Sequence, residues 1–236
     1  MVTIGFIPCR AGSERVKNKN TRPFGGFDGG LLELKLLQFQ KVSGLDRIIV
    51  SSNDPIVLDY VDQFRRNCDG RFEALPRPDE FGSSATSMES FIRNYIATLS
   101  EDGDLFWSHV THPFVDSSIY QSALELYWEK RREGYDCLVS ATKIQKFLWR
   151  DGKPFNYDNT KEKWPRSQDL QPVYEINHAI YAIPFETMRR VGDRIGNSPY
   201  FFEIEEGSAM DIDWEDQFHL LDEIASARRL QGSDLY

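Results

Sequence analysis

Short apolar runs alternate along the chain with longer segments in which apolar residues recur at helical spacing. The runs are rich in β-branched and aromatic residues, which predicts strands at 2–7, 47–52, 72–75, 105–110 and 136–141. Helices are predicted between them, at 31–42, 56–67, 88–99 and 118–132. Strands that alternate with helices in this way are typical of an α/β domain with three layers and a mostly parallel sheet.

The alternation stops near residue 142, where a polar segment begins. Residues 143–174 contain several prolines and scattered aromatic residues, among them Trp149 and Trp164. A long irregular stretch in a compact domain is usually functional or disordered, and the aromatic residues favour an arm that packs on another surface, such as a second subunit. We expect a single domain over residues 1–236, with further strands and a last helix predicted at 179–183, 209–213 and 214–230.

The first predicted strand leads into a loop, residues 9–20, that is dense in cationic and small polar side chains. Ligands bind at the carboxyl ends of strands in open α/β sheets. Gly12 lets backbone N–H groups approach an anion, Ser13 adds a hydroxyl, and positive charge comes from Arg10, Arg15, Lys17 and Lys19. We predict a site for a nucleoside triphosphate, the alternative being an ordinary solvated loop. The loop has neither the Gly-Lys-Ser/Thr of a Walker loop nor a G-x-G-x-x-G, which disfavours both of those folds.

Composition narrows the class of protein further. A net charge of −9 argues against a protein that coats nucleic acid. The cysteines are few and widely spaced, which points to a reducing cytosol, and no segment approaches the ~18 apolar residues of a membrane span or reads as a leader peptide. We therefore expect a soluble cytoplasmic protein that binds neither nucleic acid nor membrane. Cys9 lies in the candidate site, and a space-filling role is favoured over a nucleophile because no base is paired with it.

Two carboxylates close to the last predicted helix are candidates for a metal site. On a regular strand, Asp211 and Asp213 would face the same side, and two carboxylates on one face are costly unless solvent or a cation lies between them. Mg²⁺ prefers one or two carboxylates with waters and substrate phosphates. The alternative is that one aspartate caps the helix at Trp214. A zinc pair at His109 and His112 is a weaker reading, since no third ligand follows at a suitable spacing.

Several blocks of the sequence match motifs of one known family. Its opening motif, I-P-A-R-x-x-S-x-x-x-x-x-K-N, is matched at Ile7, Pro8, Arg10, Ser13, Lys19 and Asn20. Its second block, R-P-x-E-x-x-S-x-x-x-S, is matched at Arg77, Pro78, Glu80, Ser83 and Ser87. The closing D-I-D is at 211–213, and an N-A-I-Y-type strand is echoed at 177–181. The chain thus resembles, over nearly its whole length, the CMP-sugar synthetases, the cytidylyltransferases that activate sialic acids and related nonulosonic acids.

The resemblance implies a Rossmann-like nucleotidyltransferase fold, with residues 143–174 as a dimerisation arm that crosses to the partner's site in a homodimer. It implies CTP and an acidic sugar as substrates. The CTP phosphates would be held by Arg10, Ser13, Lys19 and Asn20, and the nucleoside side would be lined by Arg77, Ser83, Ser87 and His109. Mg²⁺ would be bound by Asp211 and Asp213, and the catalytic residues would be Arg10, Lys19 and Asp211. The sugar would be held by Arg166, Gln168 and Asn177.

Departures from the family pattern lie mainly on the acceptor side. His109 stands where a Gln is expected, Glu14 replaces a Lys, and Glu175 to His178 lack an Arg and a Gly of the R-P-N-G-A block. We therefore predict CMP transfer to the anomeric hydroxyl of a sialic acid-like sugar, with an unusual acceptor. The alternatives are a related cytidylyltransferase that acts on Kdo or a phosphonate, and a non-catalytic sensor of CTP or a CMP-sugar. A glycosyltransferase is disfavoured because no Asp-x-Asp ends a core strand in mid-chain.

Overall fold

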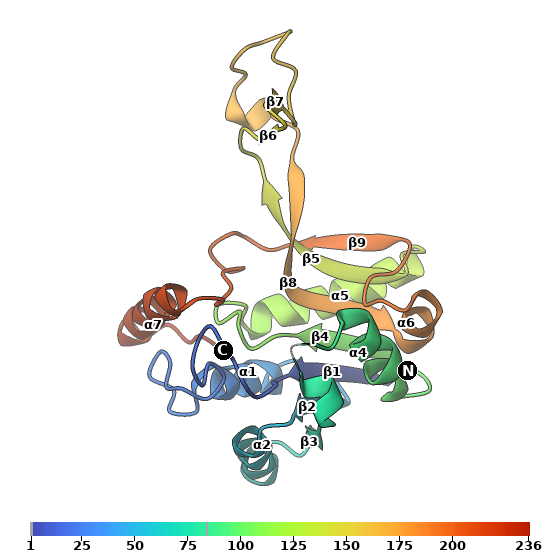
Figure 1. Ribbon diagram of the computed structural model, residues 1–236, viewed down its shortest axis with the longest axis vertical. Coiled ribbons are helices and arrows are strands. Elements are labelled where there is room, and N and C mark those ends of the chain that lie inside the picture. Colours follow the sequence, from blue (N-terminus) through green and yellow to red (C-terminus); the bar gives the residue numbers. More distant parts are fainter. Residues whose placement is uncertain (1, 84) are drawn as a thin grey trace.

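The computed structural model describes residues 2–83 and 85–236, whose backbone forms an α/β fold around one large sheet (Figure 1). The strands of this sheet are β1 (Thr3–Pro8), β2 (Arg47–Ser52), β3 (Phe72–Pro76), β4 (Asp104–Ser108), β5 (Cys137–Ile144), β8 (Val173–Pro184) and β9 (Pro199–Glu203). They lie in the order β3-β2-β1-β4-β8-β5-β9. Among the described pairs of this sheet, only those of β8 with β4 and β5 are antiparallel. The mostly parallel α/β sheet that the sequence predicts is therefore confirmed.

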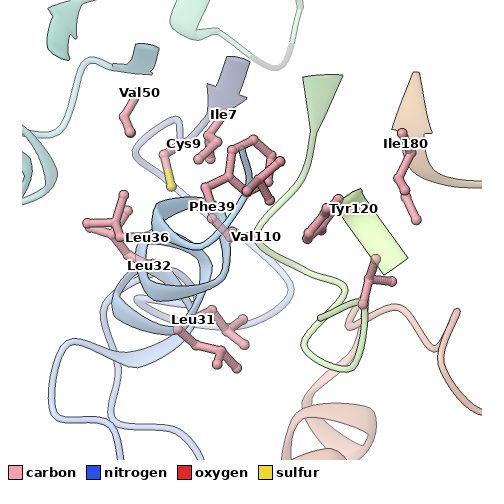
Figure 2. Packing of buried hydrophobic residues seen from close by; sticks show 14 of the residues in the cluster. Ile7, Cys9, Leu31, Leu32, Leu36, Phe39, Val50, Val110, Tyr120 and Ile180 are labelled. Atoms are coloured by element: carbon pink, nitrogen blue, oxygen red, sulfur yellow. The ribbon is translucent and has the colours of Figure 1, made fainter. Parts of the chain in front are cut away.

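Helices cover both faces of the sheet. One face is packed by α1 (Gly30–Gln40), α2 (Pro55–Asn67), α5 (Ser117–Arg132) and α7 (Glu215–Leu230). The other is packed by α4 (Met88–Asn94) and α6 (Phe185–Val191). Because successive side chains of a strand point to opposite faces, Phe106 joins the first cluster and Trp107 the second. Figure 2 shows part of the first cluster, with Leu32 and Leu36 of α1 near Val50 of β2.

The turn before α1 depends on a glycine. Gly30 has φ +66°, and a Cβ atom there would lie 2.2 Å from the backbone oxygen of Arg22. No other residue fits that close approach without a shift of the backbone. The turn fixes where α1 begins.

Residues between β5 and β8 form a projecting arm. The two strands pair antiparallel out to Ile144 and Val173, beyond the sheet, and carry a small hairpin of β6 (Trp149–Arg150) and β7 (Lys153–Pro154) at the far end (Figure 1). A short 3₁₀ turn, η2, covers Ser167–Asp169. The buried Asn156 organises this end, because its amide donates to the backbone oxygens of Lys146 and Gln171 and accepts from the backbone N–H of Leu148. The predicted arm is thus a defined structure, and it presents exposed aromatic side chains at Phe147, Trp149, Phe155 and Trp164.

The prediction of a strand at 209–213 is wrong. These residues are irregular, and the edge of the sheet is β9, which pairs parallel with β5 and was not predicted. The backbone of Ile212 makes no strand pairing in the described structure. Its N–H donates to the carbonyl of Thr111, and its carbonyl accepts from Lys19. The alternation of Met210 and Ile212 with Asp211 and Asp213 imitated a strand, whereas the segment forms part of the candidate site.

Other elements differ in extent from the predictions. The helix predicted at 88–99 ends at Asn94 and is followed by a 3₁₀ turn, η1 (Ile96–Thr98). The hydroxyl-rich loop before it contains a one-turn helix, α3 (Asp79–Gly82), and its Ser84 lies outside the described residues. β8 begins at Val173, inside the predicted arm, and α6 was not predicted. No helix in the described part of the chain is long and apolar enough to cross a membrane.

Candidate active site

The cationic loop after β1 encloses a hollow of about 300 Å³ at the carboxyl end of the sheet. Four residues predicted to hold phosphates line it together: Arg10, Ser13, Lys19 and Asn20. Gly12 has φ +74° with open space around its Cβ position, so the loop turns at a residue that adopts this conformation without strain. The loop is tied down by two hydrogen bonds, from Ala11 N–H to Asn53 Oδ1 and from Asn20 Nδ2 to the Arg10 carbonyl. The structure thus brings these four side chains together around one hollow.

Lys19 joins this loop to the end of the chain. Its Nζ donates to the carbonyl oxygen of Ile212 at 2.7 Å, between the two aspartates of the D-I-D block. Burial lowers the pKa of Lys19, and the negative charges of Asp211 and Asp213 oppose that shift. Arg15 makes a second link, with its Nη2 atom 2.9 Å from Asp213 Oδ1. Cationic and acidic residues far apart in the sequence therefore meet at one place.

A second hollow, of about 280 Å³, adjoins the first, because Pro8, Arg10 and His109 line both. Aromatic and apolar side chains form much of its wall: Phe81, Met88, Phe91 and Trp107. Arg77, which also lines it, is buried, and its guanidinium donates to the carbonyl and hydroxyl oxygens of Ser51. Flat apolar walls with a few fixed polar groups suit a nucleobase and its ribose.

Two hydroxyl residues predicted for the nucleoside side have different positions. Ser83 lines the second hollow as expected. Ser87 does not line it; its hydroxyl accepts from the N–H of Ser90 and caps the N-terminus of α4. That hydrogen bond stabilises the helix start and leaves the Ser87 side chain committed to the fold.

His109 lies at the border of these two hollows. Its ring centroid is 5.6 Å from that of Trp107. Burial lowers the pKa of His109 well below its usual value, and the positive charge of Arg194 adds to the effect. The imidazole is therefore neutral at pH 7 and presents one donor and one acceptor nitrogen.

A third hollow, of about 620 Å³, lies on the other side of the D-I-D block. Its polar lining includes Thr142, Glu175, Asn177, His178, Glu206, Asp211, Asp213 and Gln217. No Lys or Arg lines it among the residues that the structure describes. The Asn177 side chain accepts from the Ser140 hydroxyl and donates to the Thr142 hydroxyl, so its amide holds β8 to β5. The predicted sugar ligand Asn177 is thus in the wall of this hollow, with its amide already engaged.

The two aspartates offer carboxylate oxygens at the junction of the phosphate loop and the third hollow. Asp211 Oδ1 is buried and has no hydrogen-bond partner. It lies 4.0 Å from His112 Nδ1, a buried nitrogen that also has no hydrogen-bond partner. A buried carboxylate oxygen without a hydrogen-bond partner is suited to coordinate a cation. Mg²⁺ takes one or two carboxylates and its other ligands from phosphates and water, so these two residues suit it. In the described residues no group of three or more His, Cys, Asp or Glu side chains has a metal-binding arrangement.

The helix-cap alternative for the aspartates is not supported. α7 begins after Trp214, and it is Gln217 Oε1 that accepts from the backbone N–H groups of Asp213 and Trp214. The Asp213 carboxylate faces Arg15 instead. Both carboxylates are therefore available to the site rather than to the helix.

Arg166 and Gln168 lie on the arm and line none of the three hollows. Arg166 forms an ion pair with Asp169, with 2.7 Å between Nε and Oδ2, and the carbonyl of Gln168 accepts from Gln145. Within one chain the structure does not bring these two predicted sugar ligands to the site (Figure 1). Their predicted role therefore requires a second copy of the chain.

Cys9 is a core residue. Its side chain packs near Ile7, Leu32 and Leu36 (Figure 2), and burial raises the pKa of its thiol to about 12. A buried thiol with a raised pKa stays protonated at neutral pH, which supports the space-filling interpretation over a nucleophile.

Sequence reasoning did not single out Arg194. Its guanidinium lies over the rings of Tyr181 and Trp107, 4.1 and 4.9 Å from their centroids, and its Nη2 atom is 3.3 Å from His178 Nδ1. Burial lowers the pKa of Arg194. No sequence motif surrounds Arg194, and only the packing of the loop after α6 places it here.

The sheet and its cationic first loop define an α/β fold of the nucleotidyltransferase class. The sequence model of the cytidylyltransferase family matches residues 4–204, and the chain belongs to that family. It is 23% identical over 225 residues to an N-acylneuraminate cytidylyltransferase of Streptococcus agalactiae serotype III (strain NEM316), covering 92% of this chain and 52% of that protein. The chain thus spans about half the length of this curated relative.

Two solved structures share the fold. A 4-diphosphocytidyl-2C-methyl-D-erythritol synthase from Anaerococcus prevotii DSM 20548 has a TM-score of 0.64 at 15% identity, covering 98% of this chain and 96% of that one. A CMP:2-keto-3-deoxy-manno-octonic acid synthetase complexed with CTP has a TM-score of 0.63 at 13% identity, covering 98% and 100%. At these identities the likeness establishes the fold.

Proposed function

We propose that this chain transfers CMP from CTP to the anomeric hydroxyl of an acidic sugar of the nonulosonic acid type and releases pyrophosphate. The acceptor oxygen attacks the α-phosphorus of CTP, the bond from that phosphorus to the pyrophosphate oxygen breaks, and the hydroxyl proton passes to solvent. The observation that carries the proposal is the row of three hollows at the carboxyl end of the sheet, joined where Lys19 meets Ile212. The three hollows provide space for the nucleoside, the triphosphate and the acceptor.

Charge is the main barrier to this reaction, since an acidic acceptor approaches an anionic triphosphate. Arg10 borders both the nucleoside and the phosphate hollow, and Lys19 stands where the phosphate loop meets the acceptor hollow. Lys19 is held in place before the reaction by its hydrogen bond to Ile212, so it stabilises developing negative charge without reorganisation. His109, neutral beside them, offers a hydrogen bond without adding charge.

We further propose Mg²⁺ as the cofactor, with Asp211 and Asp213 as its protein ligands. The orphaned Oδ1 atom of Asp211 supports this proposal. When bound there, Mg²⁺ supplies positive charge to the phosphates and to the leaving pyrophosphate. Lys19 holds the backbone between the two aspartates, and Arg15 forms an ion pair with the Asp213 carboxylate.

The acidic sugar is proposed on the family membership and on the S. agalactiae relative, named for N-acylneuraminate. The acceptor hollow has no Lys or Arg of its own in the described part of the chain. We therefore propose that the sugar carboxylate is met by Arg166 from the arm of a second copy, in a homodimer. The exposed aromatic residues of the arm support contact with such a partner.

The direct test is pyrophosphate release by the purified chain with CTP and Mg²⁺. The acceptors are a panel of nonulosonic acids that includes N-acetylneuraminate, together with Kdo and 2-aminoethylphosphonate, and acceptor-free and ATP reactions are the controls. We expect release with a nonulosonic acid and formation of its CMP conjugate. If only Kdo or the phosphonate supports pyrophosphate release, that compound replaces the proposed acceptor. If CTP binds but no acceptor in the panel supports pyrophosphate release, the protein is a sensor rather than an enzyme.

Replacing Asp211 tests the metal proposal. Asp211→Asn keeps the shape of the side chain and removes its negative charge. We expect pyrophosphate release at millimolar Mg²⁺ to fall by about 10²-fold or more, while CTP binding measured calorimetrically without metal stays within about twofold. An Asp211→Asn enzyme that keeps its rate at low Mg²⁺ would show that this carboxylate does not bind the metal.

A further inference from the structure

His178 has a strained backbone conformation at the edge of the acceptor hollow. Its φ is +61°, in the left-handed region that non-glycine residues rarely adopt. It lies in an irregularity of β8, where the register with β5 shifts between Val139 and Ala141. Such strain persists only where the surroundings enforce it, and it gathers at functional sites. His178 occupies the position at which the family motif has a glycine, so an imidazole here stands on a backbone conformation that the glycine would adopt without strain.

Neighbouring groups determine which nitrogen of this imidazole carries the proton. His178 Nδ1 lies 2.5 Å from the Tyr181 hydroxyl and 3.3 Å from Arg194 Nη2. A guanidinium group only donates hydrogen bonds, so Nδ1 must be the unprotonated acceptor. The neutral ring then has its proton on Nε2, which no described residue engages. Burial and the charge of Arg194 also lower the pKa of His178, in agreement with a neutral ring.

The surroundings of the ring indicate what this N–H group recognises. The ring is part of the wall of the 620 Å³ hollow, together with Glu175, Glu206 and Asp211. These carboxylates accept hydrogen bonds and repel anions, so the neutral imidazole adds a donor on a wall rich in acceptors. A neutral donor binds a hydroxyl or carbonyl oxygen without needing a charged partner.

We infer that His178 is an acceptor-binding residue whose Nε2–H donates a hydrogen bond to an uncharged oxygen of the acceptor, a hydroxyl or an acyl carbonyl. The inference rests on the proposed function, since it takes the 620 Å³ hollow as the acceptor site. Arg194 and Tyr181 are positioning residues that fix the tautomer. The role is one of specificity: it distinguishes acceptors with an oxygen at this position from those without.

Two substitutions at His178 test this role. His178→Gly removes the donor and relieves the strained φ, whereas His178→Asn keeps an amide donor and tolerates the left-handed conformation. With the acidic sugar that the unmodified chain uses, a nonulosonic acid or Kdo, we expect kcat/KM for the acceptor to fall about tenfold in His178→Gly and to recover in part in His178→Asn. KM for CTP should not change. His219→Asn, at an exposed histidine of α7, is the matched control.

Thermal unfolding separates this role from a structural one. Because glycine adopts a positive φ freely, His178→Gly should unfold at the same temperature as the unmodified chain or higher. A variant with a lower unfolding temperature and an unchanged acceptor KM would show that the ring serves only the fold. Unchanged kcat/KM for the acceptor in His178→Gly would overturn the inference by itself.

The tautomer is measured without any acceptor, so it stands apart from the outcome of the pyrophosphate assay. In NMR spectra of the chain labelled with ¹⁵N-histidine, the signals that disappear in the His178→Gly variant identify this ring. We expect an unprotonated Nδ1 and a protonated Nε2 at pH 7, and a changed Nδ1 shift in Tyr181→Phe. A proton on Nδ1 would contradict the inference even if CMP transfer were established.

Discussion

Lys19 shows how one side chain connects parts of the site that are distant in the sequence. Its position in a cationic loop was predicted, but its contact with the carbonyl of Ile212 was not. The pattern of charges near residue 19 indicates an anion site. It contains no information on which later segment will face it, because that depends on how α7 and the segment before it pack.

Removing the Lys19 ammonium should affect the transition state more than CTP binding. For Lys19→Ala we expect kcat for pyrophosphate release to fall by about 10²–10³-fold, as when one preorganised donor is lost. Lys161→Ala, at an exposed position on the arm, is the control. Near-normal turnover in Lys19→Ala would show that this residue only ties the loop to Ile212.

The thiols differ in reactivity because of burial. Burial raises the pKa of both Cys9 and Cys137 to about 12, whereas Cys68 is exposed. At pH 8 only about 10⁻⁴ of a thiol with pKa 12 is ionised. We expect a thiol-specific reagent to label native protein fast at Cys68 alone, and labelling to become slow throughout in Cys68→Ser. Fast modification of Cys9, mapped by mass spectrometry, would mean that the loop after β1 opens.

At the scale of elements, the sequence predicted the strands and helices that have a strong local pattern of apolar residues. It missed the strand that exists only because it pairs with a neighbour. β2 was predicted with its observed bounds because its β-branched run is buried on both faces. β9 was missed because half-exposed Tyr200, Phe201 and Phe202 do not alternate clearly, and its strand form comes from pairing with β5. The reverse error at 209–213 has the same cause: alternation without a partner strand does not make a strand.

Helix starts are determined by local chemistry, and α5 provides a test. The Asp116 carboxylate accepts from the backbone N–H groups of Ser118 and Ile119. Asp116→Ala leaves these donors unpaired and should lower the free energy of unfolding by about 1 kcal/mol. Urea denaturation followed by circular dichroism measures the change. Asp116→Asn should stay near the unmodified value, and an equal loss in both variants would assign the effect to charge rather than capping.

At the scale of the whole molecule, the arm is the feature whose role is not explained by contacts within a single chain. It carries exposed Trp149 and Trp164 away from the sheet, and it holds Arg166 outside all three hollows of its own chain. A large exposed aromatic surface marks an interaction site. The arm therefore fits the proposed homodimer, in which each arm completes the other copy's acceptor site.

We expect light scattering after size-exclusion chromatography to give the mass of a dimer. Trp149→Glu combined with Trp164→Glu should shift the mass toward the monomer and lower turnover, because charges on the arm oppose burial. Ile56→Glu, at an equally exposed site on α2, should change neither. A monomeric, fully active unmodified chain would refute the completed-site proposal.

The sequence by itself determined the alternation of strands and helices, the cationic loop after β1 and the family motifs, because these depend on residues close together in the chain. It also indicated the arm, through the interruption of that alternation. Only the tertiary structure decided that Lys19 meets the D-I-D block, that Ser87 caps a helix, and that Arg194 lies against His178. These contacts join segments whose relative positions depend on the packing of the whole sheet, and no local pattern carries that information.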